Sequence, residues 1–190
     1  MLVRIIAGEF RGRKLLPPEG LTTRPITDRV KQSLFDILTP MLPDSRVYDC
    51  FAGTGSMGLE CLSRGAAAVI FFEADRSALQ RLRKNIETID SEHRCKVIAG
   101  DLFRWFDRPL EKDATDKADL IFLDPPYRFL RDEPQKLQRL AGRLAEHLGA
   151  EGVLIFRHDV NDVLALPPLE CFDRREYGGM VLEFLRIAKT

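Results

Sequence analysis

The feature that most constrains the fold of this chain is a regular alternation of apolar runs and amphipathic runs after residue 45. Residues 67–73 are apolar up to a final glutamate, as expected of a parallel strand that is covered on both faces. The run that follows, residues 76–89, has leucine or isoleucine at intervals of three and four, which is the spacing of one helix face. Strands that alternate with helices predict a doubly wound α/β sheet.

We expect one mostly parallel, seven-stranded sheet that ends in a C-terminal antiparallel hairpin. The expected strands are residues 46–50, 67–73, 96–101, 118–124, 152–158, 169–177 and 180–187. The expected helices between them are residues 56–64, 76–89 and 134–148. Two adjacent glycines, Gly178 and Gly179, separate the last two strands and predict the hairpin turn.

A smaller unit precedes this sheet. Its expected elements are short strands at Val3–Ala7 and Arg13–Leu16 and a helix from Thr27 or Asp28 to about Leu38. Two prolines, Pro40 and Pro43, close the unit. We therefore expect residues 1–43 to form a basic extension with a small β-hairpin and a helix, and residues 44–190 to form the main domain.

Charge is unevenly distributed along the chain. The 190 residues include 29 basic and 29 acidic side chains, so the net charge is zero. Residues 1–31, however, contain seven Lys or Arg and only three acidic residues. A basic arm on a mildly acidic body marks either a phosphate-binding surface or a solvated face, and charge alone does not separate these two interpretations.

The composition argues against several classes of protein. Four cysteines and three histidines are scattered without the spacing of a zinc site, so we expect reduced thiols and no metal. The longest apolar run, residues 66–72, is far too short to cross a membrane, and the N-terminus lacks the apolar region of a secretory signal. We expect a cytoplasmic monomer without a membrane partner.

The first strand of the sheet leads into a glycine-rich loop. Gly53, Gly55 and Gly58 form G-x-G-x-x-G, which by pattern alone is typical of an NAD(P) enzyme. Asp49, four residues before Gly53, would repel the pyrophosphate of a dinucleotide. S-adenosylmethionine carries no phosphate but has an ammonium and a sulfonium, which a carboxylate attracts. The loop therefore favours S-adenosylmethionine.

Acidic residues follow four successive strands, namely Asp49, Glu73, Asp101 and Asp124. Glu73 lies 20 residues after Gly53, the offset at which an acid meets the hydroxyls of a ribose. Asp101 would suit the exocyclic amine of an adenine. Surface exposure or helix capping is the alternative for Glu73 and Asp101.

The most specific motif is Asp124-Pro125-Pro126-Tyr127, directly after the fourth strand. The prolines hold the chain extended and end the strand ladder, so Asp124 and the proline carbonyls should point beyond the sheet, and Tyr127 can stack on a base. A carboxylate and a carbonyl that accept both N–H bonds of an exocyclic amine can aim its lone pair at a methyl carbon. Such positioning supplies up to about 7–11 kcal/mol. A rigid turn without a chemical role is the alternative.

Four segments together resemble the RsmD family, bacterial methyltransferases that modify a guanine N2 of small-subunit ribosomal RNA. They are RPITDRVKQSLFDIL (24–38), DCFAGTGSMGLE (49–60), FEAD (72–75) and DPPY (124–127). The resemblance runs essentially from end to end and includes the basic opening GEFRGRKL (8–15). The glycine loop and DPPY are shared with amino-methyltransferases generally, whereas the first segment is the more discriminating one.

The resemblance implies a Rossmann-like class I fold that binds S-adenosylmethionine, and it implies a role for each motif. The implied cofactor residues are Asp49, Phe51, Gly53, Gly55, Glu73, Asp101 and Leu102. Asp124, Pro125, Pro126 and Tyr127 would hold the target base. The implied RNA contacts are Arg11, Arg13, Lys14 and Arg24, with 16S ribosomal RNA or the assembling 30S subunit as partner.

Three other functions remain open from the sequence. The same chemistry could act on adenine N6 of RNA or DNA, or on a protein side-chain amide, although the latter enzymes more usually carry Asn in place of Asp124. An NAD(P) oxidoreductase would need a hydride-transfer site that the sequence does not suggest. A non-catalytic module that binds S-adenosylmethionine is the third alternative.

Overall fold

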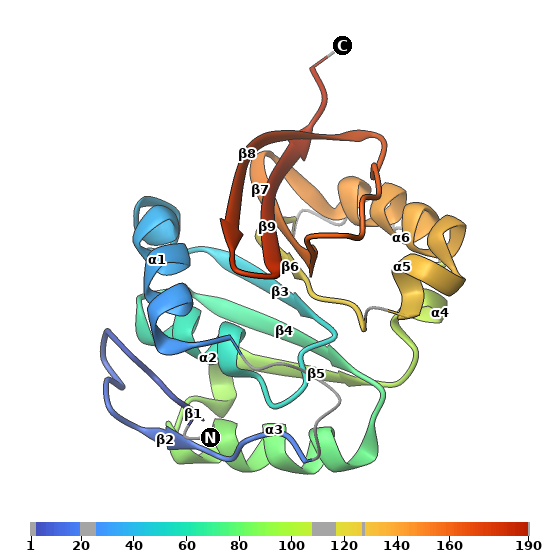
Figure 1. The fold of residues 1–190 in the computed structure, drawn as a ribbon. Helices are drawn as coiled ribbons and strands as arrows, with labels where there is room; N and C mark the ends of the chain where they lie inside the picture. The colour runs from blue at the N-terminus through green and yellow to red at the C-terminus, as the bar shows by residue number, and fades with distance from the viewer. Residues whose placement is uncertain (1–2, 20–25, 108–116, 127, 190) are drawn as a thin grey trace.

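The computed structural model describes residues 3–19, 26–107, 117–126 and 128–189. It contains a seven-stranded sheet with helices on both faces and a separate small hairpin near the N-terminus (Figure 1). In spatial order the sheet consists of β5 (Cys95–Ala99), β4 (Ala68–Glu73), β3 (Arg46–Cys50), β6 (Ala118–Leu123), β7 (Leu148–Asp159), β9 (Met180–Ile187) and β8 (Leu169–Tyr177). The first five strands are parallel and β9 is antiparallel to both of its neighbours, which confirms the predicted sheet.

Each face of the sheet has its own hydrophobic core, because successive side chains of a strand point to opposite faces. In β4, Val69 and Phe71 belong to one core and Phe72 to the other. The first core is covered by α1 (Asp28–Leu38), α2 (Ser56–Ser63) and α3 (Arg76–Thr88). The second is covered by α4 (Leu102–Phe106), α5 (Arg128–Asp132) and α6 (Pro134–His147).

The N-terminal hairpin is shorter than predicted. Its strands, β1 (Val3–Arg4) and β2 (Lys14–Leu15), have two residues each, where Val3–Ala7 and Arg13–Leu16 were expected. The backbone N–H groups of Ile6 and Ala7 donate instead to the carboxylate of Glu60, at 2.9 and 3.0 Å. A side chain of α2 therefore replaces the strand partner that these two residues would need.

The extension and the sheet share a core. Ile5, Leu15 and the buried face of α1 pack in the same cluster as α2 and β3, and the 3-10 turn η1 (Thr39–Met41) joins α1 to the sheet. Thr27 caps α1, as one of the two expected residues. The division into residues 1–43 and 44–190 stays a prediction.

Two short helices, α4 and α5, were not expected, because five residues contain too few turns to show a periodic pattern. Several other boundaries differ by one to four residues. For example, β7 begins at Leu148 instead of residue 152, and Leu148 pairs with Ala118 across a register shift in β6. No described helix has both the length and the apolar character needed to cross a membrane.

Candidate active site

The strand order reverses between β3 and β6, which are neighbours in space although two other strands lie between them in sequence. In sheets of this type, ligands bind beyond the C-terminal ends of the strands at such a reversal. Asp49 lies near the end of β3, and Asp124 directly follows β6. We call the region around Asp49, Glu73 and Asp124 the strand-end site.

The glycine loop turns sharply between β3 and α2. Phe51 has a φ of 60°, which is uncommon for a residue with a side chain and is found at functional turns. Gly53 and Gly55 have φ of 57° and 81°. A Cβ at Gly53 would meet no atom within 4 Å, so the backbone faces open space there. A Cβ at Gly55 would instead lie 2.3 Å from Leu82 Cδ1, and this glycine serves the turn and the packing below it.

Gly58, the third glycine of the motif, allows α2 to approach the sheet. A Cβ at this position would lie 2.4 Å from Cε1 of Phe71 and 2.7 Å from Cγ1 of Val69, both in β4. Its N–H donates to Oδ2 of Asp49 at 2.9 Å. Close contact between helix and strand thus places an N–H of the first turn of α2 on the carboxylate at the end of β3.

Asp49 is an acid in surroundings that disfavour its charge. Its side chain is buried, and the pKa of Asp49 is raised from 3.8 to about 7, chiefly by desolvation. The Gly58 N–H and the ammonium of Lys31 lower this pKa, whereas the charges of Asp124 and Glu73 raise it. The three carboxylates therefore lie close enough to interact, and a cation placed among them would stabilise the ionised form of Asp49.

Glu73 joins the end of β4 to the glycine loop. Its Oε2 accepts the N–H of Gly53 at 2.7 Å, and its Oε1 accepts the N–H groups of Ala74 and Asp75, each at 2.8 Å. These bonds fix the carboxylate beside the loop, on the strand next to Asp49. A ribose diol in this position would meet a carboxylate whose orientation is already set.

Asp101 and Leu102 start α4, at the end of β5. Asp101 is exposed, and its Oδ1 caps the helix by accepting the N–H of Phe103 at 2.9 Å. Asp101 therefore serves as a helix cap, the alternative that the sequence left open. Its contact with an adenine stays a prediction. The side chain of Leu102 is buried in the second core, so any ligand contact of this residue would come from its backbone.

Asp124 is held by a residue that no sequence motif indicates, Arg157. Its Oδ2 accepts a bond from Nη1 of Arg157 at 2.7 Å, and the Arg157 side chain is only 14% exposed. Burial raises the pKa of Asp124, and the guanidinium partly offsets this rise through its charge and its hydrogen bond. The strand register accounts for the pair, because Leu123 of β6 is paired with Phe156 of β7.

The prolines after Asp124 shape the exit from β6. Pro125 is buried, and the carbonyl of Pro126 accepts the N–H of Phe129 at 2.9 Å, which starts α5. This carbonyl therefore already accepts a hydrogen bond within the protein, in addition to any bond from a ligand. The sequence did not indicate this bond. Tyr127 lies outside the described residues.

An aromatic cluster lies beside the glycine loop. The ring of Phe51 is 5.9 Å from that of Phe103 in α4 and 5.7 Å from that of Phe129 in α5. The ammonium of Lys136 lies 4.4 Å from the centre of the Phe103 ring. The segments that follow β3, β5 and β6 thus contribute one apolar wall, of which the sequence identified only Phe51.

The predicted RNA-binding residues lie away from these acids. Those that the structure describes belong to the N-terminal hairpin and its flanking residues 3–19, which we call the arm. Arg11, Arg13 and Lys14 are exposed, whereas Arg24 lies outside the described residues. The arm is attached to the C-terminal end of α2, because Glu9 N donates to the carbonyl of Ser63 at 2.7 Å. Helix α2 starts at the glycine loop and runs back along the sheet, so the hairpin lies at the edge where the strands begin (Figure 1).

A buried ion pair joins α1 to α2, the helix that follows the glycine loop. Nζ of Lys31 lies 2.9 Å from Oε2 of Glu60, and the two side chains are 2% and 0% exposed. The same ammonium donates to the carbonyl of Arg4 at 3.2 Å and to Oγ of Ser56, the first residue of α2, at 3.1 Å. Lys31 therefore joins the arm, α1 and the start of α2.

Comparison with known proteins identifies the family. The family model described as "Conserved hypothetical protein 95" matches residues 3–186. The chain belongs to this family. A relative from Escherichia coli K12 named "Ribosomal RNA small subunit methyltransferase D" is 36% identical over 181 residues, which cover 94% of this chain and 86% of the relative. The RsmD resemblance is thereby confirmed.

Solved structures of similar and of more distant proteins share the fold. The structure of yhhF from Escherichia coli covers 100% of both chains with a TM-score of 0.81 and 30% identity. An RNA methyltransferase from Salinibacter ruber, solved with S-adenosyl-L-homocysteine, has a TM-score of 0.64 over 88% of this chain and 95% of that one, at 17% identity. The Rossmann-like fold of S-adenosylmethionine-dependent methyltransferases, predicted from the motifs, is confirmed.

Proposed function

We propose that this protein transfers a methyl group from S-adenosylmethionine to the exocyclic N2 amine of a guanine in 16S ribosomal RNA, in the cytoplasm. Membership of the family and the relatives named for methylation of small-subunit ribosomal RNA make it an S-adenosylmethionine-dependent RNA methyltransferase. The observation that carries the finer proposal is the placement of Asp49 and Asp124 at the same end of two neighbouring strands, since Asp49 of β3 is paired with Phe122 of β6, two residues before Asp124.

The residues of the strand-end site fit the proposed cofactor. Three interacting carboxylates suit a ligand with an ammonium and a sulfonium, and they would repel a pyrophosphate. The open backbone at Gly53 allows close approach, and Glu73 is fixed next to it. We propose that Asp49 pairs with the ammonium end, Glu73 with the ribose, and Asp101, the Leu102 backbone and the Phe51 cluster with the adenine.

When bound, S-adenosylmethionine supplies an electrophilic methyl group on a cationic sulfur. The chain supplies the position and the hydrogen bonds of the amine. Because Arg157 binds Oδ2 of Asp124, we propose that Oδ1 accepts one N–H of the target amine and that the carbonyl of Pro125 accepts the other. Two acceptors on one amine fix its plane and direct its lone pair, so that proximity and orientation lower the barrier.

Ionised Asp124 is the acceptor that this proposal needs, and Arg157 favours that form. The same carboxylate can take up the proton that the amine loses after methylation. A paired guanine hides its N2 edge in the minor groove of an RNA helix. The target guanine is therefore expected to lie in a loop or to be flipped out of the stack.

A radiochemical assay tests the reaction and its substrate. The protein is incubated with tritiated S-adenosylmethionine and with 30S subunits, naked 16S RNA, DNA or bulk protein from a strain that lacks the gene, and the product is digested to nucleosides. We expect label in N2-methylguanosine from ribosomal RNA. Label in N6-methyladenosine or in protein would contradict the proposed substrate.

The contribution of the strand-end site is tested with two variants in the same assay. Asp124→Asn should lose most of the methylation, whereas Asp132→Asn, which alters an exposed acid in α5, should keep it. Equal activity of the two variants would contradict the proposed role of Asp124.

A further inference from the structure

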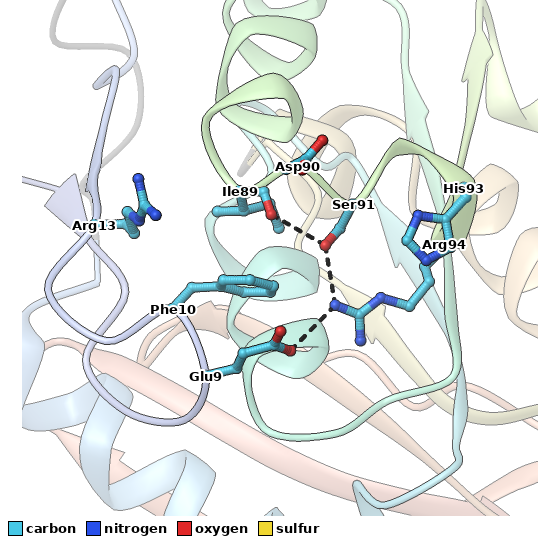
Figure 2. A pocket seen from close by; sticks show the side chains of 8 residues that line it. All are labelled: Glu9, Phe10, Arg13, Ile89, Asp90, Ser91, His93 and Arg94. Carbon is cyan, nitrogen blue, oxygen red and sulfur yellow. Dashed lines mark hydrogen bonds and ion pairs between the residues drawn. The ribbon is translucent and has the colours of Figure 1, made fainter.

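A hollow of about 500 Å³ lies where the parallel strands begin, at the end of the sheet opposite to the strand-end site. It lies between the arm and the segment that joins α3 to β5. Figure 2 shows Phe10 and Arg13 of the arm on one side and Arg94 on the other, with Glu9 and Ser91 beside it. Arg94 belongs to η2 (Glu92–Arg94), a 3-10 turn directly before β5. The hollow thus combines the basic arm with a second segment that carries basic side chains, η2.

The wall of this hollow combines an aromatic ring with a guanidinium. Cζ of Arg94 lies 5.6 Å from the centre of the Phe10 ring. Nη2 of Arg94 donates to Oγ of Ser91 at 3.0 Å, which fixes the plane of the guanidinium, and Nε is buried without a partner among the described residues. Aromatic rings and Arg planes are the surfaces on which proteins stack unpaired nucleobases.

The charges around the hollow suit one nucleotide better than a run of phosphates. Arg13 is exposed and makes no ion pair with any residue that the structure describes, so a phosphate could bind it without displacing a carboxylate. Glu9 lies 3.4 Å from Arg94 with 64% of its side chain exposed, and such a pair contributes little. Glu9 and Asp90 would repel a polyanion but can accept N–H groups of a base edge.

We propose that this hollow, which we call the arm pocket, binds an unpaired nucleotide of the RNA substrate at a distance from the methylated base. The base would stack on Phe10 and Arg94, and its phosphate would contact Arg13. This proposal rests on the proposed function, because it takes RNA as the substrate. It adds Phe10, Arg94 and a defined ligand to a surface otherwise expected only to attract phosphates.

The position of the arm pocket has a consequence for the RNA. A six-residue strand such as β4 spans about 20 Å, and the pocket and the strand-end site lie at its opposite ends. A single nucleotide cannot reach both. The pocket would therefore select RNA that is long enough, and folded in such a way, that two separated nucleotides are presented together.

Two variants that keep the charge test the pocket. Phe10→Leu removes the aromatic face but keeps an apolar side chain, and Arg94→Lys keeps the charge but loses the planar guanidinium. Each variant loses part of the stacking on the base, so it should raise the KM for 16S RNA about 5-fold or more. The KM should rise by a larger factor than kcat falls, and the Kd for S-adenosylmethionine should not change.

A matched control lies on the other face of the sheet. A second hollow of about 520 Å³ is lined by Arg139 and Arg143 of α6 together with Asp107 and Glu146, without an aromatic ring. Arg143→Lys should leave the KM for RNA unchanged. If Phe10→Leu and Arg94→Lys behave like this control, the arm pocket is not a nucleotide site.

A direct binding measurement separates this proposal from the proposed function. RNA binding is measured by filter retention with 16S RNA and with a short fragment that carries only the methylated loop. The variants should weaken binding of the long RNA and leave binding of the short fragment as in the wild type. Equal weakening for both RNAs would overturn the arm pocket. Weaker binding on replacement of Arg13, with no effect of Phe10→Leu or Arg94→Lys, would overturn it as well. Absence of methylation by the wild type would overturn the proposed function, and the binding data would still decide the pocket.

Discussion

At the level of single residues, the two acids at the boundary between β3 and β6 differ in the groups that face them. Asp124 has the guanidinium of Arg157 at 2.7 Å, whereas the hydrogen bond to Asp49 comes from the backbone N–H of Gly58. The pKa of both acids is raised by burial. Asp49 is therefore the acid that would gain most from a cation supplied by a ligand.

Replacing Asp49 with Asn should stabilise the ligand-free protein at high pH. The pKa of Asp49 is about 7 in the folded protein and about 3.8 in an unfolded chain, so the folded state holds a proton that the unfolded state releases between these values. Wild-type stability should therefore fall as the pH rises from about 4 to about 7. Above pH 7, Asp49→Asn should raise the free energy of unfolding by about 1–4 kcal/mol.

Urea unfolding at pH 5 and pH 8 measures this effect, which should be clearly smaller at the lower pH than at the higher one. Calorimetry at pH 8 should show weaker binding of S-adenosylmethionine by the same variant. A variant that is less stable than the wild type at pH 8 would mean that the ionised form of Asp49 is not disfavoured.

Removing Arg157 should move the pH dependence of methylation. Its guanidinium lowers the pKa of Asp124, so Arg157→Gln should raise that pKa and leave Asp124 protonated at higher pH. The acidic limb of the kcat profile should shift upward by about one pH unit or more, with partial recovery of activity as the pH rises. Arg157→Lys keeps a cation and should shift the limb less. Unshifted profiles in both variants would exclude a role for the pair in the protonation of Asp124.

The sequence predicted Asp124 but not Arg157, for a physical reason. The motif DPPY is local, so its acid can be recognised from adjacent residues. Arg157 lies 33 residues further along the chain, and only the pairing of β6 with β7 brings it to Asp124. For the same reason Phe103 and Phe129, which follow other strands, could not be joined to Phe51 in advance.

At the level of elements, the buried pair of Lys31 and Glu60 joins the arm to α2, and its loss should destabilise the fold. Lys31→Met would leave Glu60 buried with the Arg64 side chain and two backbone N–H groups as its partners. Removing one member of a buried pair costs about 3–5 kcal/mol, and we expect the lower end because these partners remain.

Urea unfolding measures the loss, with Arg143→Met as the control because its pair with Glu146 is about half exposed. Exposed pairs contribute about 1 kcal/mol or less. Adding Glu60→Gln to Lys31→Met should restore part of the stability, because the unpaired charge is removed. Equal effects of Lys31→Met and Arg143→Met would show that the buried pair does not hold the arm.

The glycines of α2 and α6 should respond to alanine in opposite ways. A Cβ at Gly58 would lie 2.4 Å from Phe71, and overpacking of this kind costs about 1–3 kcal/mol. A Cβ at Gly142, within α6, would meet no atom within 4 Å, and replacing a helical glycine there gains about 0.5–1 kcal/mol. Thermal unfolding should show a lower Tm for Gly58→Ala and a higher one for Gly142→Ala. A normal Tm for Gly58→Ala would mean that α2 and β4 can separate without cost.

The sheet was predictable because its parallel strands are short runs rich in apolar residues and are separated in sequence by helices. The hairpin β8–β9 was predicted with the bounds that the structure shows, since two glycines mark its turn. The strand bounds of the arm hairpin were not predicted correctly, because Glu60 supplies hydrogen bonds that the hairpin would otherwise make within itself. Pairing between residues more than 50 positions apart leaves no local signal.

At the level of the whole molecule, the sheet separates two surfaces that are both expected to meet RNA. The strand-end site lies where the strands end, and the arm lies where they begin. Charge at the arm can therefore change without a change at the cofactor residues. Phosphate contacts made there would anchor the RNA, and they would not contribute to the chemical step.

The salt dependence of RNA binding tests this separation. Each phosphate contact on single-stranded RNA contributes about −0.7 to the slope of log K against log salt, so replacing Arg11, Arg13 and Lys14 with Ala should make the slope shallower by about 2. Binding of S-adenosylmethionine should stay as in the wild type, because these side chains lie at the other edge of the sheet. Filter retention over a series of salt concentrations measures the slope, and calorimetry measures the cofactor. An unchanged slope would place the phosphate contacts elsewhere on the molecule, whereas a shallower slope with intact cofactor binding would show that the arm holds RNA independently of the site that methylates it.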